Sequence, residues 1–421
     1  MNTPKQIEDT YAISLSKTHL DYSDLLPELR KYFKDIPFNG KNTFMNVPVE
    51  VESTQLNAYS KLCSILERAL HQVVTHYFED ERIRNIYQLD SELESILKIA
   101  APTPYEVGLY RPDFVIDKNG QSKICEIGCR YPLNGWMLSY YMNLILDELS
   151  PTINHDWHAI PKQTEFVSVL AGSLDSNAPL YYVHEDEKGT EAYQFFDEIN
   201  KHGFSIADIS TQKLEVTHGE LTVNGEIAEQ LILELDREEL KRIKPEVIKA
   251  LVQSKKCLND VRTLILVHDK RILSVLYNQS IMSDYLRPED YAFLRRFLIP
   301  SYTLDSEQIR HRLIHSSSNW ALKKNSGGRG IDIYVKDDCT SQEWTDVITN
   351  EWSQYMVQEY VDQQEFELNN HDQNESINIV GMLLCHNDRF FGTGIFRGSS
   401  KSVINVHSGG YILPSATSDP S

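Results

Sequence analysis

The sequence predicts an α/β (α+β) protein with several subdomains, and three observations support this fold class. Between Pro161 and about Lys256, apolar strand-like segments alternate with amphipathic helix-like segments, as expected of a small domain with a partly parallel sheet. Upstream, two strand-like segments flank an Asn-Gly turn, and the C-terminal part is mostly strand-like. At 421 residues, the chain also exceeds what one hydrophobic core usually supports.

The first 104 residues are predicted to form a helical region. Apolar residues recur at three-to-four spacing over 56–78 and again over 91–100, which is the period of a helix with one buried face. We interpret this region as scaffold.

A β-hairpin is predicted next, with strands over 105–117 and 122–128 joined by the turn Lys118-Asn119-Gly120-Gln121. Asn-Gly favours tight hairpin turns because both residues tolerate positive φ. A helix is expected to begin at Trp136 and to end at about Leu149.

Three charged side chains of this hairpin are expected to converge. Side chains alternate along a strand, so Arg111 and Asp113 share one face and the partner strand can place Glu126 beside them. Such carboxylates suit Mg²⁺, and the arginine suits phosphate or an acyl phosphate. A salt bridge across the hairpin is the alternative interpretation.

The segment from 257 onward is predicted to begin with a long helical stretch over 266–315. Strand-like WALKK, a glycine-rich loop, strand-like IDIYV, a helix at SQEWTDVITNEW and strand-like QYMVQEYV follow. Two further strands are expected to pair across Asn387-Asp388.

The glycine-rich loop follows a strand that ends in lysine and contains Gly327, Gly328 and Gly330. Glycines let backbone N–H groups approach phosphate oxygens, while Lys323 supplies a point charge. A triphosphate is therefore a reasonable ligand, and a simple hairpin turn is the alternative.

Together these segments resemble the ATP-grasp superfamily in its circularly permuted form, as in glutathionylspermidine synthetases and eukaryotic glutathione synthetases. RPD (111–113) and CEIG (125–128) resemble the family's R-x-D and E-x-N metal-binding strands, and LKKNSGGRGI resembles its lid loop. In an unpermuted member the metal-binding strands come last, whereas here they precede the lid. The resemblance covers roughly residues 105–415.

The same resemblance implies roles for three more segments. LVHDKRILSVL resembles a helix with an ATP-contacting lysine, which is Lys270 here. FRGSSKSVINVHSGG resembles the stretch that lines the acyl-phosphate site, which implies Arg397 and Asn405. MVQEYV resembles the hinge strand that holds adenine and ribose, which implies Gln358, Glu359, Tyr360 and Val361.

The resemblance thus implies an ATP- and Mg²⁺-dependent carboxylate-amine ligase that forms an amide through an acyl phosphate. Lys270 and Lys323 would hold the phosphates, and Asp113 and Glu126 the magnesium. Arg111, Arg397 and Asn405 would act on the reacting acyl phosphate. Arg130 is expected to bind a substrate carboxylate, with a structural salt bridge as the alternative.

It also divides the chain into four regions: a helical N-terminal region, 1–104; the metal-binding strands of the permuted ATP-grasp core, 105–157; a small α/β pre-ATP-grasp domain, 158–256; and the ATP-binding lid and catalytic core, 257–421.

Two departures from the family pattern keep other functions open. Gly128 stands where the family usually has a metal-binding asparagine, and the glycine-rich loop lacks the family's metal-bridging glutamate. A nucleotide-binding pseudo-enzyme and an ATP-dependent phosphotransferase are therefore the alternatives.

Charge and composition narrow the partners to small molecules. A formal net charge of -20 opposes binding to nucleic acid or to an anionic membrane. We expect carboxylate and amine substrates such as an amino acid, a peptide or a polyamine-like compound, and the sequence is compatible with a homodimer. The polar N-terminus shows no secretory signal, which predicts a cytoplasmic protein. The six cysteines form no CxxC pair, against a zinc or disulfide framework.

Overall fold

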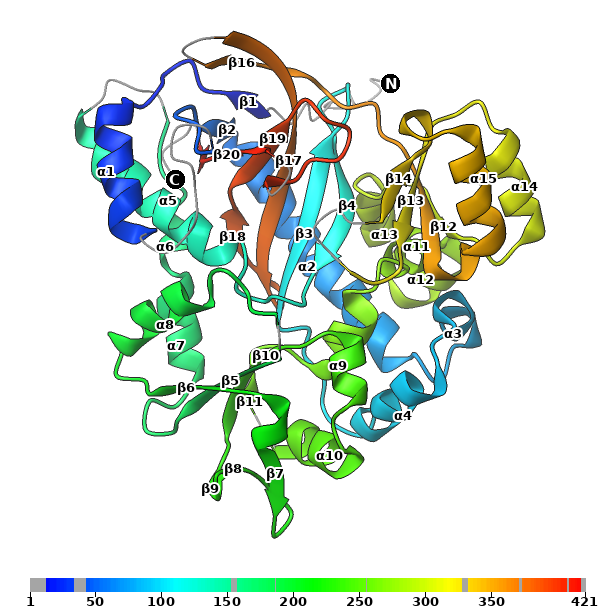
Figure 1. Cartoon of the computed structure of the whole chain (residues 1–421). Helices are drawn as coiled ribbons and strands as arrows, with labels where there is room; N and C mark the ends of the chain where they lie inside the picture. Colours follow the sequence, from blue (N-terminus) through cyan, green and yellow to red (C-terminus); the bar gives the residue numbers. More distant parts are fainter. Residues whose placement is uncertain are drawn as a thin grey trace, which may run out of the picture.

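The structure is a computed structural model of the chain, and it describes residues 13–33, 43–152, 157–185, 187–254, 256–327, 332–370, 373–406 and 409–417. A central sheet is flanked by a smaller sheet with its own helices and by a small α/β domain (Figure 1). Gly328 and Gly330 of the predicted loop lie outside the described residues.

The central sheet joins strands from both parts of the chain. It has seven strands in the order β20-β19-β17-β3-β4, with β16 and β18 also paired with β17. Its strands are β3 (Leu109–Ile116), β4 (Ser122–Gly128), β16 (Phe366–Asn370), β17 (Gln373–His386), β18 (Arg389–Thr393), β19 (Phe396–Ser399) and β20 (Tyr411–Leu413). The strands predicted to bind metal thus belong to a sheet whose other strands come from the C-terminal part of the chain (Figure 1).

The β3–β4 hairpin has the predicted turn and facing. Asp117 accepts hydrogen bonds of 2.9 Å from the amides of Asn119 and Gln121, and Gly120 has a φ of 77°. The register pairs Arg111 with Gly128 and Asp113 with Glu126. Cross-strand partners share a face, so these four residues lie on the same side of the sheet.

A four-stranded antiparallel sheet, which we call the lid, has the order β12-β15-β13-β14. Its elements are β12 (Ser301–Thr303), α14 (Glu307–His315), β13 (Trp320–Lys324), β14 (Ile333–Val335), α15 (Ser341–Asn350) and β15 (Tyr355–Glu359). The two helices pack on the sheet around Trp320, Leu322 and Trp344 (Figure 1). The prediction of an uninterrupted helical stretch over 266–315 is wrong at β12, because three residues are too few to show a strand period.

Helix α5 (Trp136–Leu149) follows the β3–β4 hairpin and precedes the small domain in the chain. Three short helices lie between the small domain and the lid: α11 (Ile272–Tyr277), α12 (Gln279–Tyr285) and α13 (Pro288–Arg295). Helices α6 (Pro161–Thr164) and α7 (Phe166–Ser173) lead into the small domain. The predicted helix from Trp136 to about Leu149 is confirmed as α5.

The small α/β domain contains a parallel four-stranded sheet in the order β11-β10-β5-β6 and an antiparallel sheet β7-β8-β9. Its elements are β5 (Leu180–His184), α8 (Ala192–Asn200), β6 (Ile206–Ile209), β7 (Leu214–Thr217), β8 (Glu220–Val223), β9 (Glu226–Ile227), β10 (Gln230–Glu234), α9 (Arg237–Lys241), α10 (Pro245–Ser254) and β11 (Lys256–Cys257). The chain leaves β5 for β6 on one side and returns to β10 on the other, so the carboxyl ends of β5 and β10 are adjacent.

The N-terminal region contains four helices among its described residues, and it also contributes two strands. These elements are β1 (Ile13–Leu15), α1 (Tyr22–Tyr32), β2 (Val49–Val51), α2 (Ser53–Thr75), α3 (Glu81–Tyr87) and α4 (Ser91–Ala100). Strands β1 and β2 form a sheet with β21 (Ser415–Ala416). The helical expectation misses these strands because each has only three residues, and because β2 also pairs with β21 near the other end of the chain.

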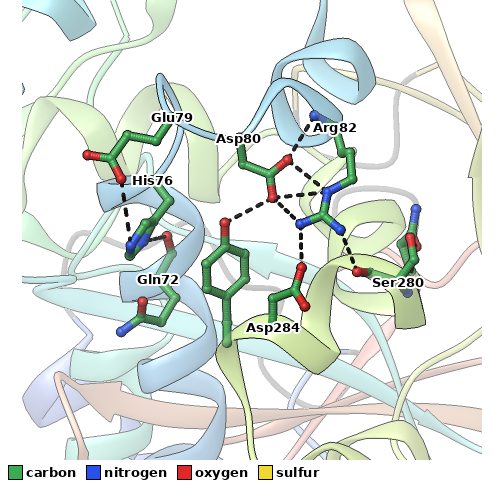
Figure 2. Close-up of polar contacts among 9 residues, drawn as sticks. Gln72, His76, Glu79, Asp80, Arg82, Ser280 and Asp284 are labelled. Carbon is green, nitrogen blue, oxygen red and sulfur yellow. Dashed lines mark hydrogen bonds and ion pairs between the residues drawn. The ribbon is translucent and has the colours of Figure 1, made fainter.

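A polar cluster ties the start of α3 to α12 (Figure 2). Asp80 caps α3 by accepting from the Arg82 amide at 2.9 Å, and it pairs with the Arg82 guanidinium at 2.6 Å. Arg82 also reaches Asp284 at 2.7 Å and the Ser280 carbonyl at 2.7 Å. Tyr285 donates to Asp80 at 2.9 Å. The cluster therefore fastens scaffold helices together.

Candidate active site

A cavity of about 1260 Å³ is lined by residues of the central sheet, the lid and the small domain. This volume exceeds that of most single-ligand pockets, so the cavity has room for more than one small molecule. The predicted site residues that line it are Arg111, Asp113, Glu126, Arg130, Lys323, Gly327, Gln358, Glu359, Tyr360, Val361, Arg397 and Asn405. Residues far apart in the sequence thus meet in one place.

Two arginines hold Asp113 on the floor of the cavity. Arg111 Nε donates to Asp113 Oδ1 at 2.8 Å, and Arg397 Nη2 donates to Asp113 Oδ2 at 2.5 Å. Burial by itself lowers the pKa of Arg111, but the carboxylate of Asp113 more than offsets this and raises it. Asp113 therefore fixes two charged guanidinium groups beside the cavity.

Glu126 presents a second carboxylate on the neighbouring strand. Burial by itself raises the pKa of Glu126, but the charges of Lys270, His268 and Lys323 overcome burial and lower it to about 2. Lys270 Nζ lies 3.8 Å from Glu126 Oε1. Glu126 is therefore ionised at neutral pH and can accept a cation.

Magnesium fits this pair of carboxylates with help from other ligands. Among the described residues, no three His, Cys, Asp or Glu side chains gather as a metal site. Mg²⁺ needs only one or two protein carboxylates when phosphate and water complete its octahedron. Glu126 would be the main ligand, with Asp113 beside it, and their metal binding stays a prediction. A Cβ on Gly128 would lie 3.4 Å from Arg111 Nη2, so Arg111 faces the position of the family's asparagine.

Lys323 is buried and fixed in orientation. Its Nζ donates to the Cys125 carbonyl at 2.8 Å and to Gln358 Oε1 at 2.7 Å, and Gln358 donates to Ser301 at 3.0 Å. Burial lowers the pKa of Lys323. Gln358 is only 1% exposed, so its side chain is committed to this lysine.

Lys270 reaches the start of the glycine-rich loop. Its Nζ donates to the Gly327 carbonyl at 2.8 Å, and its amide donates to the Asn325 carbonyl at 2.9 Å. Lys270 therefore links the loop to Glu126, although it is not among the residues that line the cavity.

The predicted hinge lies where β15 leaves the lid. The amide of Glu359 donates to the Pro300 carbonyl at 3.0 Å, and that of Tyr360 donates to the Asn319 carbonyl at 3.2 Å. Burial raises the pKa of the Glu359 carboxyl. Their contact with a nucleotide stays a prediction.

Arg130 lies among carboxylates of the small domain. Its guanidinium is 2.9 Å from Glu187, 3.4 Å from Asp236 and 3.7 Å from Glu239. Arg130 thus forms salt bridges within the protein, which was the alternative interpretation from the sequence. Its predicted binding of a substrate carboxylate stays a prediction.

His268 and Glu191 belong to the site but were not predicted from the sequence. His268 lines the cavity after a π-helical turn (Thr263–Val267), and the Cys129 amide donates to its Nδ1 at 3.4 Å. Burial and the charge of Lys270 lower its pKa to about 4. The sequence signal that could have identified His268 was its position two residues before the predicted Lys270. Glu191 has no such signal, because the amides that donate to its carboxylate, those of Gly135 and Leu138, lie 56 and 53 residues earlier in the chain.

Comparisons with known proteins give a family match, a sequence relative and a structure of similar fold. Residues 62–266 match the family described as the AnkG N-terminal domain. The chain is 21% identical over 426 residues to the ATP-grasp enzyme ankG of Aspergillus thermomutatus, with 87% of each chain covered. Its fold is similar to that of a glutathione synthetase-like effector (GSS30) from Globodera pallida in apo form. The TM-score is 0.58 at 11% identity, and 94% of this chain and 97% of that chain are covered.

The predicted resemblance to ATP-grasp proteins is therefore confirmed, and the chain has a mixed α/β fold that is similar to that of a glutathione synthetase-like protein. Circular permutation and the residue roles stay predictions. Among the described residues, no helix is both long and apolar enough to cross a membrane.

Proposed function

We propose that this chain is an ADP-forming, Mg²⁺-dependent carboxylate-amine ligase that makes an amide through an acyl phosphate. One observation carries the proposal: Lys323 of the lid lines one cavity together with Glu126 and the arginine-bound Asp113 of the central sheet. Lys270 lies beside this cavity, where it contacts Glu126 and Gly327. The name of the relative, an ATP-grasp enzyme, supports ATP as the energy source.

In this proposal the lid side binds the nucleotide. Lys323 and Lys270 neutralise phosphate charge, and Lys270 also donates to the Gly327 carbonyl. Glu359 and the residues after it hold adenine and ribose at the hinge. Catalysis by such a site is mainly positioning and charge stabilisation.

The floor of the cavity acts on the acyl group. Glu126, with Asp113 beside it, would hold Mg²⁺, which would neutralise charge at the phosphates. Arg111 and Arg397 stabilise the charge that grows on the oxygens between carboxylate and transferred phosphoryl group. The amine then attacks the acyl carbon, the C–O bond to phosphate breaks, and inorganic phosphate leaves. We place Asn405, which lines the cavity, near this leaving phosphate.

We further propose small substrates, an amino acid, a peptide or a polyamine-like amine, and a cytoplasmic location. The net charge of -20 favours cationic over polyanionic partners.

One observation also favours a second candidate. Asp113 is occupied by two guanidinium groups and Gly128 offers no metal ligand, as in a pseudo-enzyme that binds nucleotide without ligation. A product-detected screen with ATP, Mg²⁺, amino acids, peptides and polyamines separates the candidates. ADP with an amide supports ligation, and ADP with a phosphorylated end product indicates a phosphotransferase. Nucleotide binding with no ATP consumption indicates the pseudo-enzyme.

A further inference from the structure

The loop between β4 and α5, residues 129–135, is contacted by several carboxylates of the small α/β domain. Glu191 accepts hydrogen bonds from the amides of Gly135 at 2.6 Å and Leu138 at 2.7 Å. At the other end of the loop, Glu187 pairs with Arg130 at 2.9 Å. The small domain therefore holds the segment that directly follows the strand of Glu126.

Asn134 connects this loop to the candidate active site. Its carbonyl accepts from Arg111 Nη1 at 2.6 Å, while the other side of that guanidinium holds Asp113. The side-chain Oδ1 of Asn134 is buried and has no hydrogen-bond partner among the described residues. A buried acceptor without a partner is costly, so a missing partner is expected nearby.

Glu234, the last residue of β10, also has a buried side-chain oxygen without a hydrogen-bond partner among the described residues, which we call an orphan oxygen like that of Asn134. The side chain is 0% exposed, and its Oε2 accepts from the Tyr182 hydroxyl and from the Gly189 amide at 2.7 Å. Its Oε1 has no partner within the described part of the chain. Burial raises the pKa of Glu234 to about 7, so the protonated form is accessible.

The two orphan oxygens approach the same point. A Cβ on Gly189 would lie 2.6 Å from Glu234 Oε1 and 2.9 Å from Asn134 Oδ1, so both oxygens face the same position beside Gly189. Two acceptors repel each other. A proton on Glu234, or a half-turn of the Asn134 amide, makes them a donor and an acceptor.

We infer that Glu234 is a positioning residue, whose hydrogen bond to the Asn134 side chain holds the Asn134 carbonyl against Arg111. Glu234 thereby sets the Arg111 guanidinium relative to Asp113, although Glu234 is not among the residues that line the cavity. The inference rests on the proposed function only for the catalytic role of Arg111.

The test compares Glu234→Gln with Glu234→Leu. Glutamine keeps the shape and can bond to Asn134, to Tyr182 and to the Gly189 amide, whereas leucine can bond to none of them. With the substrates identified by the screen, E234L should lower kcat by about tenfold or more, because misplacing a catalytic group mainly affects the chemical step. The KM for ATP should stay within about twofold, and E234Q should keep kcat within about threefold.

Tyr182→Phe is the matched control, since it removes the other side-chain bond to Glu234 and leaves Asn134 untouched. Amide hydrogen exchange of residues 129–135 gives a readout independent of turnover. Exchange should accelerate in E234L and stay at the wild-type rate in E234Q and Y182F. If no protein turns over but this exchange pattern holds, the proposed function fails while the positioning contact stands.

Wild-type kcat and exchange in E234L would overturn the inference, and so would an E234Q variant as impaired as E234L. If E234L does not fold, Asn134→Ala carries the same test, because it removes the partner side chain and keeps the carbonyl. The same loss of kcat is expected there, and wild-type behaviour would overturn the inference.

Discussion

Glu126 and Asp113 are neighbours across a β-ladder, yet their surroundings give them different tasks. Asp113 is bound by Arg111 and Arg397, whereas Glu126 faces lysines that keep it ionised. The register that pairs them was predictable from the alternation of side chains. The hydrogen bond from Arg397 to Asp113 was not predictable, because these residues lie on β19 and β3, with β17 between them, and no local sequence pattern encodes the contact.

At Glu126, Glu126→Gln should lower kcat by about a hundredfold or more, since it removes the ionised oxygen that would hold Mg²⁺. Binding of ATP measured without Mg²⁺ should change by less than about threefold. Steady-state kinetics and calorimetry would measure the two quantities. Glu229→Gln, an exposed site away from the cavity, is the control, and equal activity of both variants would remove Glu126 from the metal site.

At Lys323, Lys323→Met should weaken ATP binding by about ten- to a hundredfold, because a charged hydrogen bond to phosphate is worth about 1.5–3 kcal/mol. Methionine fills the same buried space but removes the donor to Gln358 Oε1 and to the Cys125 carbonyl, so the melting temperature should fall and is measured beside the affinity. Titration with ATP monitors the effect, with the exposed Lys213→Met as control. Unchanged affinity in K323M would show that the phosphates lie elsewhere.

At the scale of elements, the polar cap on α3 links stability to pH. The Arg82 guanidinium lowers the pKa of Asp80 to about 2, below its ordinary value near 3.8. A lowered folded-state pKa contributes stability above the unfolded pKa, and that contribution is lost as the pH falls from about 4 toward 2.

Asp80→Ala should therefore lower the free energy of unfolding by about 1–2 kcal/mol at pH 7, through loss of the cap and its ion pairs. The difference from wild type should shrink below about pH 4. Chemical denaturation at several pH values measures it. Glu79→Ala is the control and should change stability little, because the Glu79 side chain is 75% exposed and forms only a long ion pair of 3.9 Å with His76. A constant difference down to pH 2 would contradict the ion-pair explanation.

The rings of Phe114 and Phe396 pack over Gly381 of β17, and this close approach requires glycine. A Cβ on Gly381 would collide with the rings of Phe114 and Phe396, both buried in the core. Gly381→Ala should therefore destabilise the protein by about 1–3 kcal/mol. The matched control is Gly172→Ala in α7, where a Cβ meets nothing within 4 Å and helix propensity improves. Thermal unfolding of both variants would show opposite shifts, and a stable G381A would contradict the packing.

For the whole molecule, long segments were more predictable than their assembly. The hairpin over 105–128, the helix at 341–352 and the alternation in the small domain follow from local periods and turn residues. Strands β1, β2 and β12 were missed, because three residues carry no period and their stability comes from distant partners.

For the candidate site too, single motifs were predictable from the sequence, whereas contacts between distant residues were not. Most of its residues could be named because each resembles a motif, and the structure brings them to one cavity. His268 and Glu191 were missed, since their roles arise from neighbours in space. The ion pairs of Arg130 likewise come from three separate positions in the small domain.

The central claim is ligation through an acyl phosphate, and transfer of isotopic oxygen tests it most directly. The carboxylate substrate identified by the screen would be labelled with ¹⁸O and incubated with ATP, Mg²⁺ and the amine. We expect ADP, an amide and inorganic phosphate that carries one ¹⁸O atom from the carboxylate. Amide formation with unlabelled phosphate, or release of AMP and pyrophosphate, would contradict the proposed chemistry.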